Sequence, residues 1–365
     1  MRIMVIHYKK LLLLLMAIVL NFSLHAQNKI SKKIEKTFPM TNSGKLYLEN
    51  NYGDISVQGW NKERLVIKME IEVTHKKSEN AKNLLDRIGT SINENKDYII
   101  FKTAIAEKST GFFAKYWSKA NPFDYDKSNL KINYKVFLPK NAELDITNKF
   151  GDIIVEDWTG KFKTDIQHGD LWLNGNLNFV DITMKYGKIK AETINYGNVR
   201  VKNGKFIVEN SEDLRVNSSG STLNLETINA LELYSNKDEI KIDVVNKIKG
   251  SMKFTTIDIN SLKKETNLDL KIADLIIKEI ITTKPFIKIN QESSEININV
   301  EDTSLKFNAT LEEGLLRLPK SFKNVTSDVI DKGDRIRKIN ATYGKEQLGS
   351  ITIIGKKGLI QIKDN

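Results

Sequence analysis

Three aspartates that each follow a glycine are the side chains of this sequence with the clearest capacity for chemistry. Asp54, Asp152 and Asp170 lie in "NYGDISV", "KFGDIIV" and "QHGDLWL". Hydrolysis of a glycosidic bond requires a pair of carboxyl groups, and a polysaccharide lyase or hydrolase on a β-helix would carry its acids on one outer face. Cation binding is the second chemistry open to these carboxylates. Both chemistries depend on the acid.

The glycine of this pattern is constant, whereas the acid is not. The five copies, "NYGDISV", "KFGDIIV", "QHGDLWL", "KYGKIKA" and "NYGNVRV", follow the glycine with Asp, Asp, Asp, Lys and Asn. Glycine adopts positive φ without steric cost, so it lets a chain turn from one strand into the next, under cover of the preceding aromatic residue. We therefore predict no catalytic, cofactor-binding or metal-binding residues. The predicted structural turns are at Gly53, Gly151, Gly169, Gly187 and Gly197.

Histidine and cysteine chemistry is also restricted. The chain has no cysteine and four histidines, of which only His75 and His168 lie beyond residue 26. His168 takes the aromatic place in "QHGDLWL", where packing over the turn is its expected role. The sequence contains no GxSxG, HExxH, phosphate-loop or dinucleotide-binding motif. These observations favour a protein that is not an enzyme.

The N-terminal segment has the pattern of a secretory signal peptide. Residues 1–26 combine basic side chains, the apolar run "LLLLLMAIVL" and the small residue Ala26 at the expected cleavage position. Removing this segment leaves 54 basic and 46 acidic residues, a balance that permits contact with acidic glycans. Nucleic acid is not an expected partner, because no binding motif is present. The mature chain has no apolar run of about 20 residues that could span a membrane, and we expect it in the periplasm or on the cell surface.

A repeat of 17 or 18 residues follows residue 141. Short apolar segments begin at steps of 18, 18, 17, 17, 17, 17, 18 and 21 residues, a unit too short for a strand and a packed helix. The repeat predicts an all-β fold: a single-stranded, β-helix-like solenoid over residues 141–302, taken as right-handed, with coils about 4.8 Å apart. A sandwich or propeller would not produce so even a step. The segments begin at Ile153, Leu171, Ile189, Phe206, Leu223, Ile240, Ile257, Leu275 and Ile296.

Different patterns flank the repeat. Residues 27–140 form a predicted N-terminal β module with a helix over 78–94, which Ser78 would cap. Residues 303–365 are expected to form a β cap on the open end of the solenoid. Within the N-terminal module, an aromatic insert over 111–125 either packs its rings on the domain or forms a candidate binding surface. Its aromatic side chains are Phe112, Phe113, Tyr116, Trp117, Phe123 and Tyr125.

The order of these patterns resembles that of a known family of unknown function. The strand "GDISVQGW", the following "LVIKMEIEV", the segment "SENAKNLLDRI", the strand end "VFLP" and the repeated "FGDIIVED" are similar to the bacterial putative-adhesin family that carries the DUF4097 domain. The similarity covers residues 45–300, and the "HAQ" context resembles exported proteins of Bacteroidetes. The resemblance implies a solenoid-like envelope protein with an adhesive role, and it supplies no catalytic residues.

These patterns leave three functions open. The first is an adhesin-like surface for an envelope or matrix polysaccharide or for another envelope protein. The second is a scaffold or sensor in the cell envelope. The third is the polysaccharide lyase or hydrolase. We expect the first, with no cofactor.

Overall fold

A computed structural model describes residues 28–106, 129–346 and 348–364. The predicted signal peptide and the aromatic insert at 111–125 lie outside these ranges. The described chain is mostly β-strand and contains one helix, α2, and it divides into two compact units. No helix within the described ranges is long and apolar enough to cross a membrane.

The elements up to residue 156 are short and of mixed type. In chain order they are β1 (Asn28–Pro39), β2 (Lys45–Asn51), β3 (Ile55–Trp60), β4 (Arg64–His75), α2 (Ser78–Arg87), β5 (Ile88–Asn95), β6 (Tyr98–Ile105), β7 (Leu130–Pro139), β8 (Glu143–Lys149) and β9 (Ile153–Glu156).

The elements after residue 156 are all strands. They are β10 (Lys161–Gln167), β11 (Leu171–Lys185), β12 (Lys188–Lys202), β13 (Lys205–Ser219), β14 (Thr222–Asn236), β15 (Glu239–Lys253), β16 (Thr256–Lys271), β17 (Asp274–Ile280), β18 (Phe286–Glu292), β19 (Glu295–Asn299), β20 (Leu305–Glu312), β21 (Leu315–Arg317), β22 (Lys323–Asp331), β23 (Ile336–Tyr343), β24 (Gly349–Lys356) and β25 (Leu359–Lys363).

The smaller unit contains the described parts of residues 1–33, 70–89 and 105–131. Its helix α2 buries Ala81, Leu84 and Leu85, which share one face because they are three or four residues apart. An ion pair of 2.8 Å joins Lys29 to Glu72 in the same unit. Burial of this helix face is what the amphipathic pattern predicts.

The helix is shorter than the predicted range 78–94. It ends at Arg87, and the following residues form β5. The change follows from the residue types, because Ile88, Gly89 and Thr90 in succession are all poor helix formers. The expected cap at Ser78 is also wrong: Lys77 holds the N-cap position, and no side-chain hydrogen bond caps the helix.

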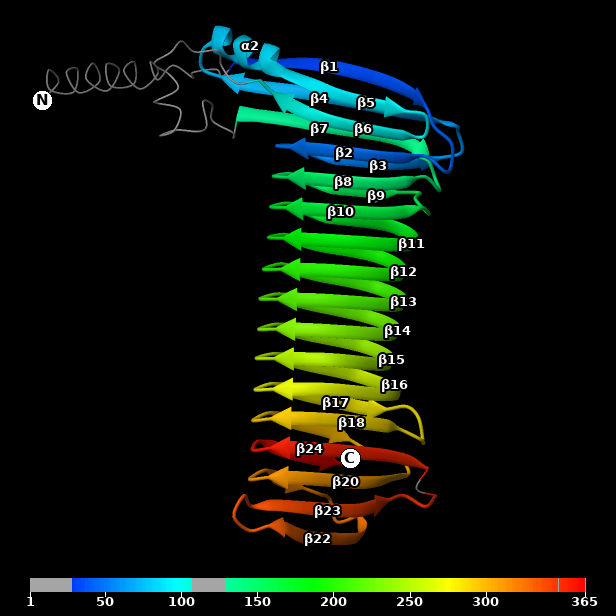
Figure 1. Ribbon diagram of the computed structural model, residues 1–365, viewed down its shortest axis with the longest axis vertical. Coiled ribbons are helices and arrows are strands. Elements are labelled where there is room, and N and C mark those ends of the chain that lie inside the picture. Colours follow the sequence, from blue (N-terminus) through cyan, green and yellow to red (C-terminus); the bar gives the residue numbers. More distant parts are fainter. Residues whose placement is uncertain (1–27, 107–128, 347, 365) are drawn as a thin grey trace, which may run out of the picture. The chain divides into compact units, whose positions relative to one another are not determined.

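The larger unit contains residues 34–69, 90–104 and 132–365, and its strands form a stack of parallel coils (Figure 1). Each strand from β11 to β16 makes one coil, and a two-residue bend connects it to the next. Neighbouring coils pair in parallel, with partners 17 or 18 residues apart. This arrangement agrees with the β-helix-like fold expected from the repeat, and the hand of the coil stays a prediction.

The predicted series of apolar residues forms one column of the stack. Ile153 pairs with Leu171, Leu171 with Ile189, and Ile189 with Phe206, and the series continues in the same register to Ile296. Every member is buried in the core. Because each strand alternates inward and outward side chains, this single column fixes which residues face water.

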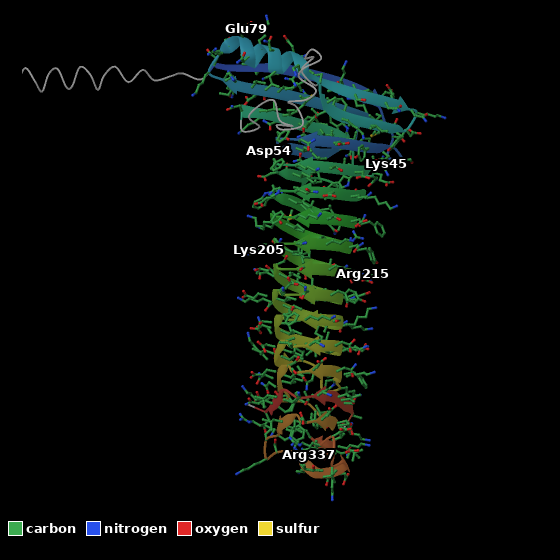
Figure 2. The ribbon with its side chains drawn as sticks, turned by 60° about the vertical axis from the view of Figure 1, so that its left-hand side comes forward. Lys45, Asp54, Glu79, Lys205, Arg215 and Arg337 are labelled. Carbon is green, nitrogen blue, oxygen red and sulfur yellow. The ribbon has the colours of Figure 1, made fainter. Side chains whose placement is uncertain are left out.

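Each coil has two limbs that meet at a corner. In β13 the first limb buries Phe206 and Val208, and the second limb buries Leu214 and Val216. Figure 2 shows side chains of the two limbs on opposite sides of the stack. We call the outer surface of the second limbs, from β8 through β10 to β16, the second-limb face. It positions the candidate site described below.

The stack begins inside the segment that the sequence pattern assigns to an N-terminal module. Strand β2 pairs in parallel with β8, and β3 with β9. The repeated motifs around Asp54 and Asp152 therefore lie in adjacent coils, although 98 residues separate them. The domain boundary expected at residue 140 therefore separates strands that pair with each other.

The C-terminal tail, which belongs to the segment 303–365 expected to form a cap, is part of the stack. Strand β24 pairs in parallel with β18 and with β20, so it lies between them. Strand β25 lies in the same way between β19 and β21. The antiparallel hairpin of β22 and β23 pairs with the other edge of β20. Apolar strands in the tail can therefore complete a coil that the continuous part of the chain leaves open.

Candidate functional site

The bends between coils place positive φ on the residue before the glycine. Tyr52, Phe150, His168 and Tyr186 have φ between 55° and 68°, whereas the four glycines that follow them do not have positive φ. The expectation that these glycines adopt positive φ is therefore wrong. The aromatic residue makes the turn, and the glycine has another role.

Close contact between coils explains the glycines. A Cβ atom added to Gly151 would overlap the carbonyl oxygen of Gly53, and one added to Gly169 would overlap that of Gly151. The same relation connects Gly187 to Gly169. Glycine lets backbones approach each other where a side chain would not fit. These residues lie in the predicted bends, but steric space rather than turn geometry requires them.

The fifth predicted turn, at Gly197, does not exist. Gly197 lies within β12, opposite Val180 and Leu214. A Cβ atom at this position would lie 2.7 Å from Cγ2 of Ile194 and 3.0 Å from Cδ1 of Leu214. The motif "NYGNVRV" thus matches the bend sequence by residue type but is not a whole coil away from the other copies.

The three aspartates that follow a glycine, Asp54, Asp152 and Asp170, connect neighbouring coils. Oδ1 of Asp54 accepts a hydrogen bond of 2.8 Å from the backbone amide of Asp152, and Oδ1 of Asp152 accepts one of 2.8 Å from Asp170. Asp170 in turn accepts from the amide of Lys188 at 2.9 Å. In the part of the chain that the structure describes, no cluster of acids and histidines could hold a metal ion. The geometry assigns these carboxylates a structural role.

Four rings stack along the same bends. The ring centroids of Tyr52 and Phe150 are 5.5 Å apart, those of Phe150 and His168 5.1 Å, and those of His168 and Tyr186 4.8 Å. All three pairs are within 6° of parallel. His168 thus packs between two rings, and each ring supports the next along the column.

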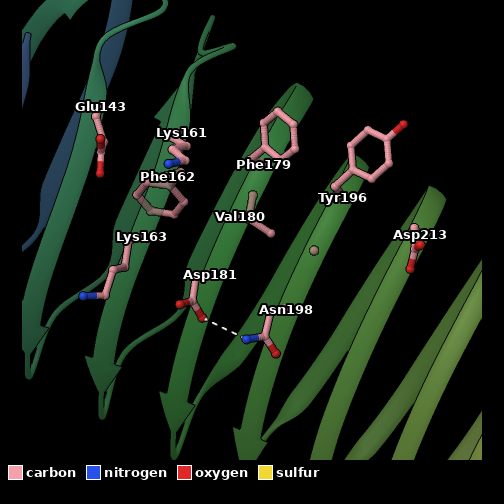
Figure 3. A pocket seen from close by; sticks show the side chains of 11 residues that line it. Glu143, Lys161, Phe162, Lys163, Phe179, Val180, Asp181, Tyr196, Asn198 and Asp213 are labelled. Atoms are coloured by element: carbon pink, nitrogen blue, oxygen red, sulfur yellow. Dashed lines mark hydrogen bonds between the residues drawn. The ribbon is translucent and has the colours of Figure 1, made fainter. Parts of the chain in front are cut away.

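A different aromatic pair marks the candidate binding groove on the second-limb face. Phe179 in β11 and Tyr196 in β12 are stacked with centroids 5.3 Å apart, and 52% and 51% of their surfaces are exposed. They line a groove of about 460 Å³ (Figure 3). We call it the aromatic groove, and its lining residues are Glu143, Lys161, Phe162, Lys163, Phe179, Val180, Asp181, Tyr196, Gly197, Asn198 and Asp213.

Polar side chains face the rings across the floor of the aromatic groove. Two positions along the strand from Phe179, Asp181 accepts hydrogen bonds from Asn198 at 3.5 Å and from Arg200 at 2.6 Å. Val180 and Gly197 lie between the ring column and this polar column. The groove therefore offers an apolar platform on one side and charged or amide groups on the other, an arrangement suited to a ligand with both apolar and hydroxyl surfaces.

The sequence contains a signal for this groove outside the repeated glycine motif. In the correct register Phe179 and Tyr196 are direct partners in adjacent coils, and both lie at outward positions, where the alternation predicts polar residues. Two aromatic residues on the outer face of successive coils are more informative than aromatic density in one segment. The residues of that segment, Phe112 to Tyr125, lie outside the described ranges, so their role as a binding surface stays a prediction.

Comparison with known proteins identifies similar structures but no family. No protein-family model matches the sequence, so the resemblance to the DUF4097 family is not confirmed, and no curated protein matches it. The chain is similar to a putative cell adhesion protein from Clostridium sporogenes, with 16% identity over 92% of this chain and 100% of that chain, at a TM-score of 0.22. It is also similar to a putative adhesin from Bacteroides fragilis, with 11% identity over 92% and 97% of the two chains and a TM-score of 0.25.

A third similar structure is a putative adhesin from Parabacteroides distasonis, with 11% identity over 90% of this chain and 97% of that chain and a TM-score of 0.30. Similarities with such low identities and TM-scores carry no argument about function. The function has to follow from the residues of the chain itself.

Proposed function

We propose that the protein is a non-enzymatic binding module of the bacterial cell envelope and that it holds a glycan in the aromatic groove. The observation that carries this proposal is the pair of half-exposed, stacked rings of Phe179 and Tyr196 beside the polar pair Asp181 and Asn198. The proposal includes export by the N-terminal signal peptide, to the periplasm or the cell surface, and membership of the putative-adhesin family.

The chemistry of a sugar ring matches the two sides of this groove. The C–H face of a pyranose is apolar and can cover an aromatic ring, while its hydroxyl groups can donate to a carboxylate such as Asp181 or bond to an amide such as Asn198. Both rings stand on strands that are hydrogen-bonded on either side, so little conformational entropy is lost when a ligand binds. A rigid sheet of this kind favours recognition without a moving lid.

The absence of enzymatic activity is part of the proposal. The acids that could have formed a catalytic pair, Asp152 and Asp170, each use one oxygen to bond the backbone of the next coil. A lyase or hydrolase would release products from polysaccharide, and an assay for unsaturated or reducing ends with the wild-type protein tests this point. Product formation that is lost in an Asp152→Asn variant would contradict the proposal.

Binding to immobilised polysaccharides tests the aromatic groove. We expect Phe179→Ala with Tyr196→Ala to raise the Kd for a retained polysaccharide at least about tenfold, equivalent to about 1.4 kcal/mol. Phe286→Ala is the matched control, because Phe286 is 49% exposed and lies in the same outward column, five coils further along. Equal losses in the two variants would show that exposed rings act without a specific site.

The alternative function is that of a scaffold or sensor in the cell envelope, and the same binding experiments test it. Affinity capture from envelope extracts would then recover a stoichiometric protein partner, and polysaccharide would not retain the wild-type protein. Deletion of residues 111–125 tests the other candidate surface. Retention that depends on this segment and not on Tyr196 would move the binding site to the aromatic insert.

A further inference from the structure

A second groove crosses the second-limb face over β11 to β15, and its volume is about 530 Å³. Its two sides are neighbouring outward columns of the stack, one from Thr183 to Ser251 and the other from Lys185 to Lys253. We propose that this basic groove binds an acidic polysaccharide through the carboxylate or sulfate groups of the polymer. The site is separate from the aromatic groove, and its argument does not depend on that proposal.

The charge of the basic groove is of one sign. Lys185, Arg200, Lys202 and Lys253 line it, and none of its lining residues is acidic. The three lysines are exposed, and none of them has an ion pair or side-chain hydrogen bond with another described residue. Arg200 is paired with Asp181 at 2.6 Å, outside the groove. Three of the four cations are therefore available to an anion.

Two of the lysines lie where their charges do not stabilise the fold. Lys185 and Lys202 are register partners in adjacent parallel strands. Like charges in neighbouring positions of a sheet repel and lower its stability. Elsewhere on the stack, opposite charges one coil apart form pairs, such as Lys163 with Asp145 at 3.4 Å. A bound anion would remove the repulsion between Lys185 and Lys202.

Small side chains form the floor in the middle of the groove. Ser218 and Ser235 lie there, at positions that Val201 and Met252 occupy in the flanking coils. Both serine hydroxyls point inward and donate hydrogen bonds of 2.6 Å to Oδ2 of the buried Asp238. This carboxylate is satisfied inside the core and does not line the groove, so the charge that a ligand meets at the surface is positive.

Neutral hydrogen-bonding groups lie between the cations. Ser219 and Asn236 separate Lys202 from Lys253 in one column, and Asn217 and Tyr234 lie beside them in the other. Lys185 and Lys253 are four coils apart, or about 19 Å at the usual spacing of strands. Charged groups at the ends and hydroxyl or amide groups between them suit an extended chain of acidic sugars. A small anion would need donors that converge on one point.

Binding of defined polymers tests this proposal. Polygalacturonate and dextran sulfate are the acidic probes, and neutral dextran is the uncharged one. The variant is Lys185→Gln with Lys202→Gln and Lys253→Gln, and the matched control is Lys205→Gln with Lys264→Gln and Lys288→Gln. The control removes the same charge from exposed lysines that do not line the groove.

We expect the groove variant to raise the Kd for an acidic polymer at least about 30-fold and the control variant less than about threefold, at about 0.15 M salt. The control variant should unfold at the wild-type temperature, because its three side chains are exposed. The groove variant should unfold at the same or a slightly higher temperature, because it also loses the repulsion between Lys185 and Lys202. The effect should persist in the variant that lacks the rings of Phe179 and Tyr196, which separates this site from the aromatic groove.

Four outcomes would overturn the proposal. Equal losses in the two triple variants would show that net charge alone attracts the polymer. Wild-type protein that binds neutral dextran as tightly as the acidic polymers would show that charge is not recognised. Competition by millimolar inorganic sulfate would indicate a site for a free anion. Binding to phosphatidylglycerol vesicles, with no binding to acidic polysaccharide, would assign the lysines to a membrane surface.

Discussion

Oδ1 of Asp54 accepts a hydrogen bond of 2.8 Å from the backbone amide of Asp152, a residue 98 positions later in the chain. The bond repeats between Asp152 and Asp170, so one acid in each of these bends holds the next coil. Asp54 and Asp152 serve the fold through an acceptor oxygen, and Asp170 adds an ion pair of 3.3 Å with Lys188.

Substitution at Asp54 separates the acceptor from the charge. Asp54→Asn keeps an oxygen at Oδ1 and should leave the unfolding temperature nearly unchanged. Asp54→Ala removes the acceptor and should lower the free energy of unfolding by about 1 kcal/mol, the usual value of one hydrogen bond. Thermal and denaturant unfolding followed by circular dichroism measure both. An equal loss in the two variants would show that the charge matters.

Substitution at Gly151 tests the close contact of the coils. Gly151→Ala would place a methyl group on the carbonyl oxygen of Gly53, and we expect a loss of about 2 to 3 kcal/mol, as in overpacked cores. Gly89→Ala is the control, because a Cβ atom there meets nothing within 4 Å. If Gly151→Ala unfolds like the wild type, backbone contact does not determine the residue type at the bend.

Two phenylalanines, one in β11 and one in β13, differ sharply in burial, which predicts a contrast in stability. Phe206 is fully buried, whereas Phe179 is half exposed. Phe206→Ala should lower the free energy of unfolding by about 3 to 5 kcal/mol, and Phe179→Ala by less than about 0.5 kcal/mol. Denaturant titration of the two variants checks the inward and outward assignment. Similar losses would mean that the register of β11 or β13 is wrong.

Tyr134 makes the stability of the larger unit sensitive to high pH. Burial raises the pKa of Tyr134 to about 12, although the hydrogen bond of 2.6 Å with Thr103 opposes the shift. Because the pKa of the folded state exceeds the value near 10 expected in the unfolded chain, stability is complete below pH 10 and falls as pH rises through 12. The loss should amount to about 2 to 3 kcal/mol.

Unfolding measured from pH 9 to pH 12 tests this window. Tyr134→Phe should be less stable than the wild type at pH 9, where it lacks the bond to Thr103, and should lose less stability above pH 10. Ultraviolet titration of the phenol provides a second readout. A wild-type phenol that ionises near pH 10 would contradict the predicted burial.

The stacking register could be predicted from the sequence because one coil has an almost constant length. The series from Ile153 to Ile296 marks inward residues at steps of 17 or 18, and a step of 21 at its end also falls in register. The helix ends at Arg87 because Ile88, Gly89 and Thr90 are poor helix formers. The spacing of apolar residues alone does not predict this end.

Features that depend on contact between distant segments could not be read from single motifs. The glycines were recognised, but their steric reason appears only when Gly53 and Gly151 are neighbours. Gly197 matched the motif by residue type alone. The aromatic groove and the basic groove both require the side-by-side placement of Phe179 with Tyr196 and of Lys185 with Lys202, which follows from the register and not from the composition of any one segment.

The position of β24 and β25 has a consequence for the order in which the stack can be completed during synthesis. Both strands insert between coils whose own residues, 286–299 and 305–317, are made earlier. Until residues 349–363 arrive, β18 and β20 have no partner between them, and this end of the stack is missing one layer. A chain cut short before Gly349 therefore leaves the facing edges of β18 and β20, and of β19 and β21, without their partner strands, and unpaired strand edges promote aggregation.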